Sequence, residues 1–334
     1  MASSQHTFGL CVYGIQYLTV NPKNPSPLDA NRFADLAAKH GLSTLEVSLS
    51  YVSPELDPNA IRDYASRAGD RGMQVVVAGP NLSRADDVER QLELAADAGA
   101  SVFRCVTSPL LEGNREPLGG YDGWQRHLDS IIAKLRELAP RAEELGVRIG
   151  LENHQDADSI DLVRVCETVG SPNVGVTLDA GNPLAVGEDP VEFATRILPY
   201  LVDVHLKDYR MIVTDEGFRL VHCAIGDGVV DFEALWPLFD SKPEVPRSIE
   251  MASLNQRHVK LLTDEWWAGH ARRDVRTIVP VLRIMRERGE PDGDPRAWQT
   301  PIEHGDLTNA AEWEMERFER SVANLAKIER KAKA

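Results

Sequence analysis

Short apolar runs rich in β-branched residues alternate along the chain with longer segments whose apolar residues recur at helical spacing. Two of the longer segments carry clear end signals: residues 27–41 finish at Gly41, and residues 83–99 open with Ser83 and finish at Gly99. The short runs occupy residues 8–13, 43–49, 73–79, 101–106, 147–153, 174–181, 201–208 and 247–251. Eight strand–helix alternations predict an α/β fold, a (β/α)8 TIM barrel, with a doubly wound sheet as the alternative.

Some of the chain extends beyond a barrel of about 250 residues, the usual size of this fold. The chain has 334 residues, so we assign residues 1–290 to the barrel and residues 291–334 to a linker and a C-terminal helical arm. The long loop expected after the eighth strand, residues 253–274, carries Trp266–Trp267. It is either an active-site lid or contact surface, or a segment whose tryptophans pack onto the barrel wall. The charged helix expected over residues 307–331 either wraps a neighbouring subunit in an oligomer or lies along its own barrel.

Composition narrows the class of ligand and the cellular compartment. The net charge of −15 argues against nucleic acid, whose binding needs clustered lysine and arginine, but leaves a neutral sugar open. The four cysteines are scattered and form no CxxC pair, which favours buried free thiols in a reducing cytoplasm. The N-terminus lacks a signal-peptide pattern, and no apolar run approaches the roughly 18 residues of a membrane span. We therefore expect a soluble cytoplasmic protein with no membrane partner.

Four candidate metal ligands stand at the ends of the last four apolar runs: Glu152, Asp179, His205 and Glu250. The carboxyl ends of parallel barrel strands converge on one rim, so these side chains are expected to meet there. Three carboxylates and one imidazole suit a hard divalent ion, Mn²⁺ first and Mg²⁺ or Co²⁺ as alternatives, better than a thiolate-rich zinc site does. Any one of them alone is explained equally well as a polar group at a strand end. All four together predict one divalent metal ion.

Strand periodicity adds two neighbours to this group. Side chains at i and i+2 share a face, so His154 is expected beside Glu152, and Lys207 beside His205. The pKa of histidine lies near neutrality, which makes His154 a candidate acid or base; the alternative is that it only hydrogen-bonds substrate hydroxyls. Glu46 and Asn81, near the ends of the second and third runs, are candidates for binding a substrate hydroxyl, and Asp208 for orienting an imidazole or an ammonium. Arg104 and Arg210 either clamp a substrate or pair with a carboxylate.

The segments LENH, VTLDAGNP, VHLKD, IGDGVVDF and SIEM, in this order and spacing, resemble the xylose-isomerase-like TIM barrels. This is the sugar isomerase and epimerase superfamily, which includes inosose dehydratases and C-glycoside deglycosidases, and the resemblance covers roughly residues 7–290. It implies that the four candidate ligands hold one Mn²⁺-type ion and that Glu152 and Glu250 also act as acid and base. HLKDYR departs from the pattern of the ketose epimerases, and ENH resembles members that act on oxidised sugars. The chain is therefore similar to a C-glycoside deglycosidase catalytic subunit in particular.

The expected chemistry is removal of a proton from the carbon next to a sugar carbonyl, with the metal stabilising the enediolate. We favour elimination from a 3-keto C-glycoside, in which His154 removes the proton and Lys207 assists the departing aglycone. The Trp266–Trp267 loop is then expected to hold the aglycone or a small accessory subunit. An aldose or ketose isomerase or epimerase is the main alternative. A metal-dependent endonuclease is disfavoured by the net charge of −15, and a non-enzymatic sugar-binding protein by four intact ligands.

Overall fold

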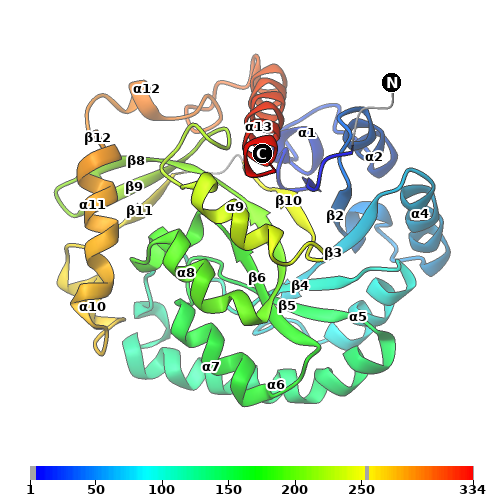
Figure 1. Cartoon of the computed structure of the whole chain (residues 1–334), viewed down its shortest axis with the longest axis horizontal. Helices are drawn as coiled ribbons and strands as arrows, with labels where there is room; N and C mark the ends of the chain where they lie inside the picture. Colours follow the sequence, from blue (N-terminus) through cyan, green and yellow to red (C-terminus); the bar gives the residue numbers. More distant parts are fainter. Residues whose placement is uncertain (1–4, 253–255, 334) are drawn as a thin grey trace.

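Eight parallel strands close into a barrel in the computed structural model, which describes residues 5–252 and 256–333 (Figure 1). Their order around the barrel is β1-β10-β7-β6-β5-β4-β3-β2. Each predicted run coincides with one of them, and only β3 extends past its run, which ends at residue 79. The strands are β1 (Gly9–Cys11), β2 (Thr44–Ser48), β3 (Gln74–Asn81), β4 (Val102–Val106), β5 (Arg148–Glu152), β6 (Val174–Asp179), β7 (Leu201–Leu206) and β10 (Arg247–Ile249). The predicted (β/α)8 barrel is confirmed, and the doubly wound alternative is wrong.

Amphipathic helices cover the outside of the barrel. They are α2 (Ala30–Lys39), α4 (Pro58–Asp70), α5 (Val88–Asp97), α6 (Gly120–Leu145), α7 (Ser159–Val169), α8 (Pro190–Ile197) and α9 (Phe232–Asp240). Aspartates start several of them: the Asp29 carboxylate accepts the N–H groups of Asn31 and Arg32 at 2.9 Å, and Asp231 accepts that of Ala234 at 3.0 Å. Shorter turns are α1 (Gln16–Thr19), α3 (Leu49–Val52), α10 (Asp264–Ala268), α12 (Pro295–Trp298), η1 (Glu116–Leu118), η2 (Asn182–Val186), η3 (Leu198–Tyr200) and η4 (Val275–Ile278). None of the described helices is long and apolar enough to cross a membrane.

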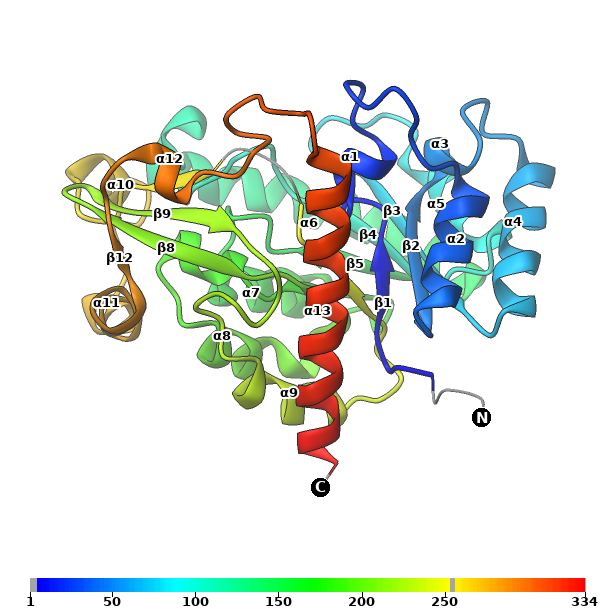
Figure 2. The same cartoon turned by 90° about the horizontal axis from the view of Figure 1, so that it is seen from above.

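The C-terminal helix α13 (Ala310–Ala332) lies along its own barrel, against α1 and α9 (Figure 2). Phe318 and Leu325 are completely buried on its inner face. The carboxylate of Glu314 accepts the backbone N–H groups of Tyr17 at 3.1 Å and Leu18 at 2.8 Å, which ties the helix to α1. Of the two placements considered for the predicted charged helix, the structure has the one along the same chain.

A second sheet of four strands stands beside the barrel, in the order β11-β9-β8-β12 (Figure 1). Its strands are β8 (Tyr209–Thr214), β9 (Gly217–His222), β11 (Arg257–Val259) and β12 (Glu290–Pro291), and it is joined to helix α11 (Val279–Arg288). The antiparallel hairpin of β8 and β9 follows β7 almost directly. Sequence reasoning missed this sheet because all eight apolar runs that it recognised were assigned to the barrel.

The tryptophan pair belongs to the packed interior. Trp266 is 3% exposed, and its ring stacks on His270 with centroids 3.9 Å apart. Trp267 is half-buried and donates its indole N–H to the carbonyl of Leu261 at 3.1 Å. Of the alternatives weighed for the 253–274 loop, packing onto the protein therefore holds for the tryptophans; residues 253–255 lie outside the described part of the chain. All four cysteines are free and buried, as predicted.

Replacing Phe318 by alanine tests the docking of α13. We expect Phe318→Ala to lower the free energy of unfolding by about 3–5 kcal/mol, because the ring is fully buried and leaves a cavity. Glu319→Ala, on the same helix with a side chain 54% exposed, should change it by less than about 0.5 kcal/mol. Chemical denaturation of both variants measures this. Equal stability of both variants and the wild type would show that the helix does not hold the barrel together.

Candidate active site

Glu152, Asp179, His205 and Glu250 meet at the carboxyl end of the barrel. Glu152 and Asp179 are the last residues of β5 and β6, His205 lies in β7, and Glu250 follows β10 directly. One possible ligand atom from each lies within 4.8 Å of the others, and all four residues are buried. The strand ends therefore bring together the whole set of residues that the sequence predicted as metal ligands.

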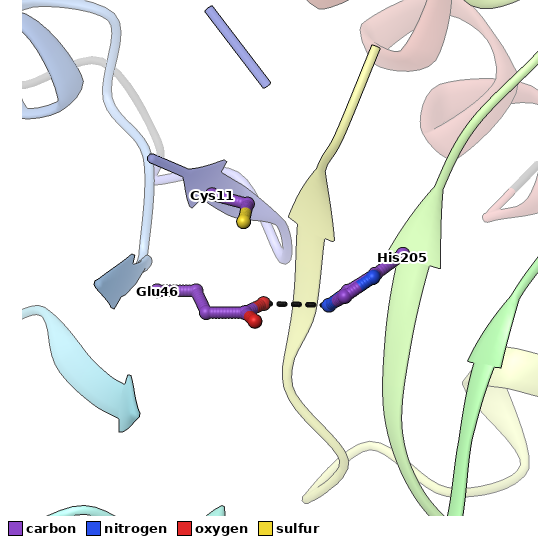
Figure 3. A group of neighbouring side chains, drawn as sticks. All are labelled: Cys11, Glu46 and His205. Carbon is purple, nitrogen blue, oxygen red and sulfur yellow. Dashed lines mark hydrogen bonds and ion pairs between the residues drawn. The ribbon is translucent and has the colours of Figure 1, made fainter. Parts of the chain in front are cut away.

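A buried carboxylate fixes the orientation of His205 (Figure 3). Glu46, completely buried on β2, lies 2.7 Å from Nε2 of His205, while Nδ1 faces Glu250 at 2.8 Å. When Nε2 carries the proton and donates it to Glu46, Nδ1 presents its lone pair to the other ligands, which is the tautomer that a metal ligand needs. Glu46 also contacts Arg104 at 3.1 Å, and its binding of a substrate hydroxyl stays a prediction.

Cys11 lies beside Glu46 and His205 in the same group of buried side chains (Figure 3). Burial raises the pKa of its thiol well above the ordinary value, and the charges of Glu46 and Glu250 raise it further. A thiol held neutral is a poor metal ligand. Of the two groups of candidate ligands that share His205, we therefore favour the one with Glu152, Asp179 and Glu250 over the one with Cys11 and Glu46.

The centre of the barrel carries more buried negative charge than its own cations neutralise. Five carboxylates are buried here, those of Glu46, Glu152, Asp179, Asp203 and Glu250, against the side chains of Arg104 and Lys207 and a histidine. Burial, together with neighbouring carboxylates, raises the pKa of Asp179 to about 7 and that of Asp203 to about 7. A divalent cation would offset this excess.

Three of the four candidate ligands also have atoms without hydrogen-bond partners. Within the described part of the chain, Oε1 of Glu152 is buried and accepts no hydrogen bond. Nδ1 of His205 and Oε2 of Glu250 are buried 2.8 Å apart, and Oε2 lies 3.0 Å from the Lys207 ammonium, but neither atom forms a hydrogen bond of regular geometry. Such orphaned groups are rare in native proteins unless a water, ion or ligand satisfies them. The fourth ligand, Asp179, is held in place by the side-chain amide of Asn182 at 2.7 Å and the N–H of Gly181 at 3.2 Å. The donor set thus fits a hard divalent ion.

Lys207 reaches the same group, as strand periodicity predicted. Its ammonium contacts the carboxylate of Asp179 and lies 3.0 Å from that of Glu250. Burial by itself would lower the pKa of Lys207, but these two carboxylates raise it well above its ordinary value. Lys207 is therefore a buried cation that points at the candidate ligands and can donate a proton there.

A cavity of about 280 Å³ opens over these groups. Its lining includes Glu152, Lys207, Glu250 and the half-buried His154. Nδ1 of His154 is buried and, among the described residues, has no hydrogen-bond partner. His154 thus lies on the same side as Glu152, as the i and i+2 relation predicted.

The rest of the cavity wall comes from the loop after β5 and from the second sheet. Gln155 holds a left-handed backbone angle, φ 68°, and its side-chain amide donates to Asn182 and Tyr209, each at 3.2 Å. Tyr209, His222 and Arg257 also line the cavity. Sequence reasoning did not assign Tyr209, His222 or Arg257 to the site. The apolar alternation of residues 209–222 was the signal that could have placed them.

Other candidate residues have structural roles. Asp208 accepts four backbone N–H groups, those of Tyr209, Gly226, Gly228 and Val230, at 2.9 to 3.1 Å. It therefore fixes the 226–230 turn and does not orient an imidazole or ammonium, and burial raises its pKa to about 6. Arg210 pairs with Glu290 at 2.8 Å. The Asn81 side chain accepts the N–H of Ser83 at 2.9 Å.

Two of the proteins that this chain resembles in sequence are a decarboxylase and a dehydratase. The chain is 24% identical over 272 residues to the 3-oxo-isoapionate decarboxylase of Pectobacterium atrosepticum, a match that covers 80% of this chain and 89% of that protein. It is also 24% identical to the inosose dehydratase of Bacillus thuringiensis, over 46% of this chain and 54% of that protein.

Solved structures agree on the fold. The D-psicose 3-epimerase of Clostridium cellulolyticum, solved with D-tagatose, has a TM-score of 0.54 at 19% identity, covering 79% of this chain and 94% of that one. An L-ribulose 3-epimerase has a TM-score of 0.52 at 18% identity, covering 84% and 97%. The sequence profile of the family described as xylose isomerase-like TIM barrel matches residues 34–265, more than half of the chain. The chain belongs to the xylose isomerase-like TIM barrel family.

Proposed function

We propose that this protein binds one divalent metal ion, Mn²⁺ first and Mg²⁺ or Co²⁺ as alternatives, through Glu152, Asp179, His205 and Glu250. The observation that carries this proposal is the group of four buried residues that each offer one possible ligand atom within 4.8 Å of the others. The excess of buried carboxylates and the hydrogen bond that turns Nδ1 of His205 toward them support it. Oxygen and imidazole donors match the preference of these ions.

The reaction we propose is removal of a proton from the carbon next to the carbonyl of a keto-sugar. A divalent ion at this site would polarise the carbonyl and stabilise the negative charge that develops on its oxygen. His154, which lines the cavity beside Glu152, accepts the proton. Lys207 holds a proton beside the reacting atoms and can deliver it to the departing or newly basic group. Glu152 and Glu250 line the same cavity and are the second acid–base pair to test.

Elimination is the outcome we favour. In a 3-keto C-glycoside the proton leaves the carbon beside the carbonyl, the bond from the next carbon to the aglycone breaks, and the aglycone carbon takes a proton from Lys207. The cavity of about 280 Å³ suits a single sugar ring, so the aglycone would project outside it. Because Trp266 is buried, the tryptophan loop gives no support for an aglycone site. The dehydratase and decarboxylase relatives favour a lyase that acts on a keto-sugar.

An isomerase or epimerase is the second candidate, and the fold likeness to two 3-epimerases favours it. The same enediolate would then take its proton back, on the opposite face or on the neighbouring carbon, with Glu152 and Glu250 as acid and base. The cytoplasmic location, the oligomer, the accessory subunit and the division at residue 290 stay predictions.

Metal binding should stabilise the fold. We expect about one Mn²⁺ per chain, and a gain of about 2.7 kcal/mol in unfolding free energy at an ion concentration of about 100 times Kd. Asp179→Asn should lose both effects, while Glu93→Gln, which alters a surface carboxylate paired with Arg141, should keep them. Elemental analysis and thermal unfolding with and without Mn²⁺ measure this. A wild-type protein with neither bound metal nor a shift would refute the metal proposal.

Glu46→Gln tests whether Glu46 strengthens metal binding by orienting His205, without being a ligand itself. The amide keeps the shape of the side chain, but its neutral oxygen is a weaker acceptor for the Nε2 proton of His205 than a carboxylate, so the required tautomer is less favoured. We expect Mn²⁺ affinity to fall about 10–100-fold while one site per chain remains. Competition with a metal indicator dye gives the affinity. Unchanged affinity would mean that the hydrogen bond does not set the ligand state.

His154→Gln should lower kcat about 10²–10⁴-fold without changing the metal content, because it removes a proton acceptor and leaves the four ligands intact. The assay is a panel of 3-keto C-glycosides, 3-keto O-glycosides and free ketoses, with solvent deuterium incorporation followed by mass spectrometry. Rapid turnover of free ketoses alone would establish the isomerase or epimerase candidate and contradict the lyase. Full activity of His154→Gln would remove this residue from the mechanism.

A further inference from the structure

The cavity wall supplied by the second sheet carries cationic and hydrogen-bonding groups that the proposed metal chemistry does not use. Arg257 is the first residue of β11 and His222 is the last residue of β9, in neighbouring strands of that sheet. Both line the cavity together with Glu250 and Lys207. The reacting end of the cavity belongs to the barrel, and this wall belongs to the added sheet.

Arg257 is the feature that needs an explanation. Among residues 5–252 and 256–333, no carboxylate forms an ion pair with it, and its Nε is buried without a hydrogen-bond partner. The other arginine that lines the cavity, Arg104, is paired with Glu46 and Glu152. A half-buried guanidinium without a counter-charge is costly, so an anion from outside the chain is the natural partner.

His222 provides a second, independent group at the same wall. It is 4% exposed, and its Nδ1 is buried with no hydrogen-bond partner in the described chain. Burial lowers the pKa of His222 well below its ordinary value, and the charges of Lys207, Arg317 and Arg257 lower it further. A neutral imidazole carries one N–H group, so His222, which lines the cavity, can donate a hydrogen bond without adding a charge.

We propose that Arg257 and His222 bind a carboxylate of the substrate, so that the substrate is a keto-sugar acid. The inference rests on the proposed function, because it assumes that the sugar carbonyl lies at the metal end of the same cavity. The planar guanidinium matches a carboxylate, and one unpaired cation balances one negative charge. Lys207 is already engaged by Asp179 and Glu250, which leaves a phosphate dianion short of a second cation. A cavity of about 280 Å³ accommodates a single sugar acid.

Three ligands that differ only at one carbon test this proposal: D-fructose, D-fructuronate and D-fructose 6-phosphate. Calorimetric titration of the Mn²⁺-loaded protein should show D-fructuronate binding at least tenfold tighter than D-fructose. Arg257→Gln should weaken D-fructuronate about 30-fold or more, as expected when one partner of a buried charge pair is removed, and change D-fructose less than about threefold. Arg257→Lys should retain part of the preference. Arg219→Gln, on β9 but paired with Asp292 and lying over Trp298, is the matched control and should behave as wild type.

Each other result overturns the proposal. Equal affinity for D-fructose and D-fructuronate, no binding of D-fructuronate, or a preference that survives in Arg257→Gln would show that Arg257 recognises no carboxylate. Tighter binding of D-fructose 6-phosphate would assign the wall to a phosphate. Metal content measured on the same samples separates this failure from that of the proposed function: a protein that holds one Mn²⁺ but shows no carboxylate preference refutes the inference alone.

Discussion

Buried negative charge is concentrated at the carboxyl end of the barrel, and the arrangement of the candidate active site follows from it. Five carboxylates are withdrawn from water there, with Arg104 and Lys207 as the neighbouring cations. Ions buried in a protein are tolerated only when they are paired or coordinated. Two cations neutralise part of this buried negative charge: Arg104 pairs with Glu46 and Glu152, and Lys207 pairs with Asp179 and Glu250. The negative charge that they leave unpaired is the reason why we propose a divalent ion here.

The barrel provides this arrangement because its strands are parallel. Each strand ends on the same rim, so single residues far apart in sequence converge without any long loop. The inward face continues below the ligands, where Glu46 supports His205 from β2 on the far side of β1 and β10. The second sheet forms one side of the cavity, and its strands contribute Tyr209, His222 and Arg257 to the wall. The architecture thus separates a reacting end from a wall that can recognise the substrate.

Sequence alone could predict the barrel, because eight apolar runs and capped amphipathic segments recur with clear periods. It could also predict the grouping of Glu152, Asp179, His205 and Glu250, because each stands at the end of such a run. The partners Glu46 and Arg257 could not be assigned in this way. Glu46 acts through a contact 159 positions away, and Arg257 reaches the cavity through a strand pairing that no local pattern reveals. The role of Asp208 likewise depends on the fold of the 226–230 turn.

The most direct test of the proposed metal site is an anomalous difference map from crystals of the protein grown with Mn²⁺. We predict one strong peak per chain, within coordination distance of the carboxylates of Glu152, Asp179 and Glu250 and of Nδ1 of His205. We also predict that Lys207 remains beside the ligands and that Glu46 holds Nε2 of His205. A map with no peak in the barrel, or with a peak bound by other residues, would contradict the central claim.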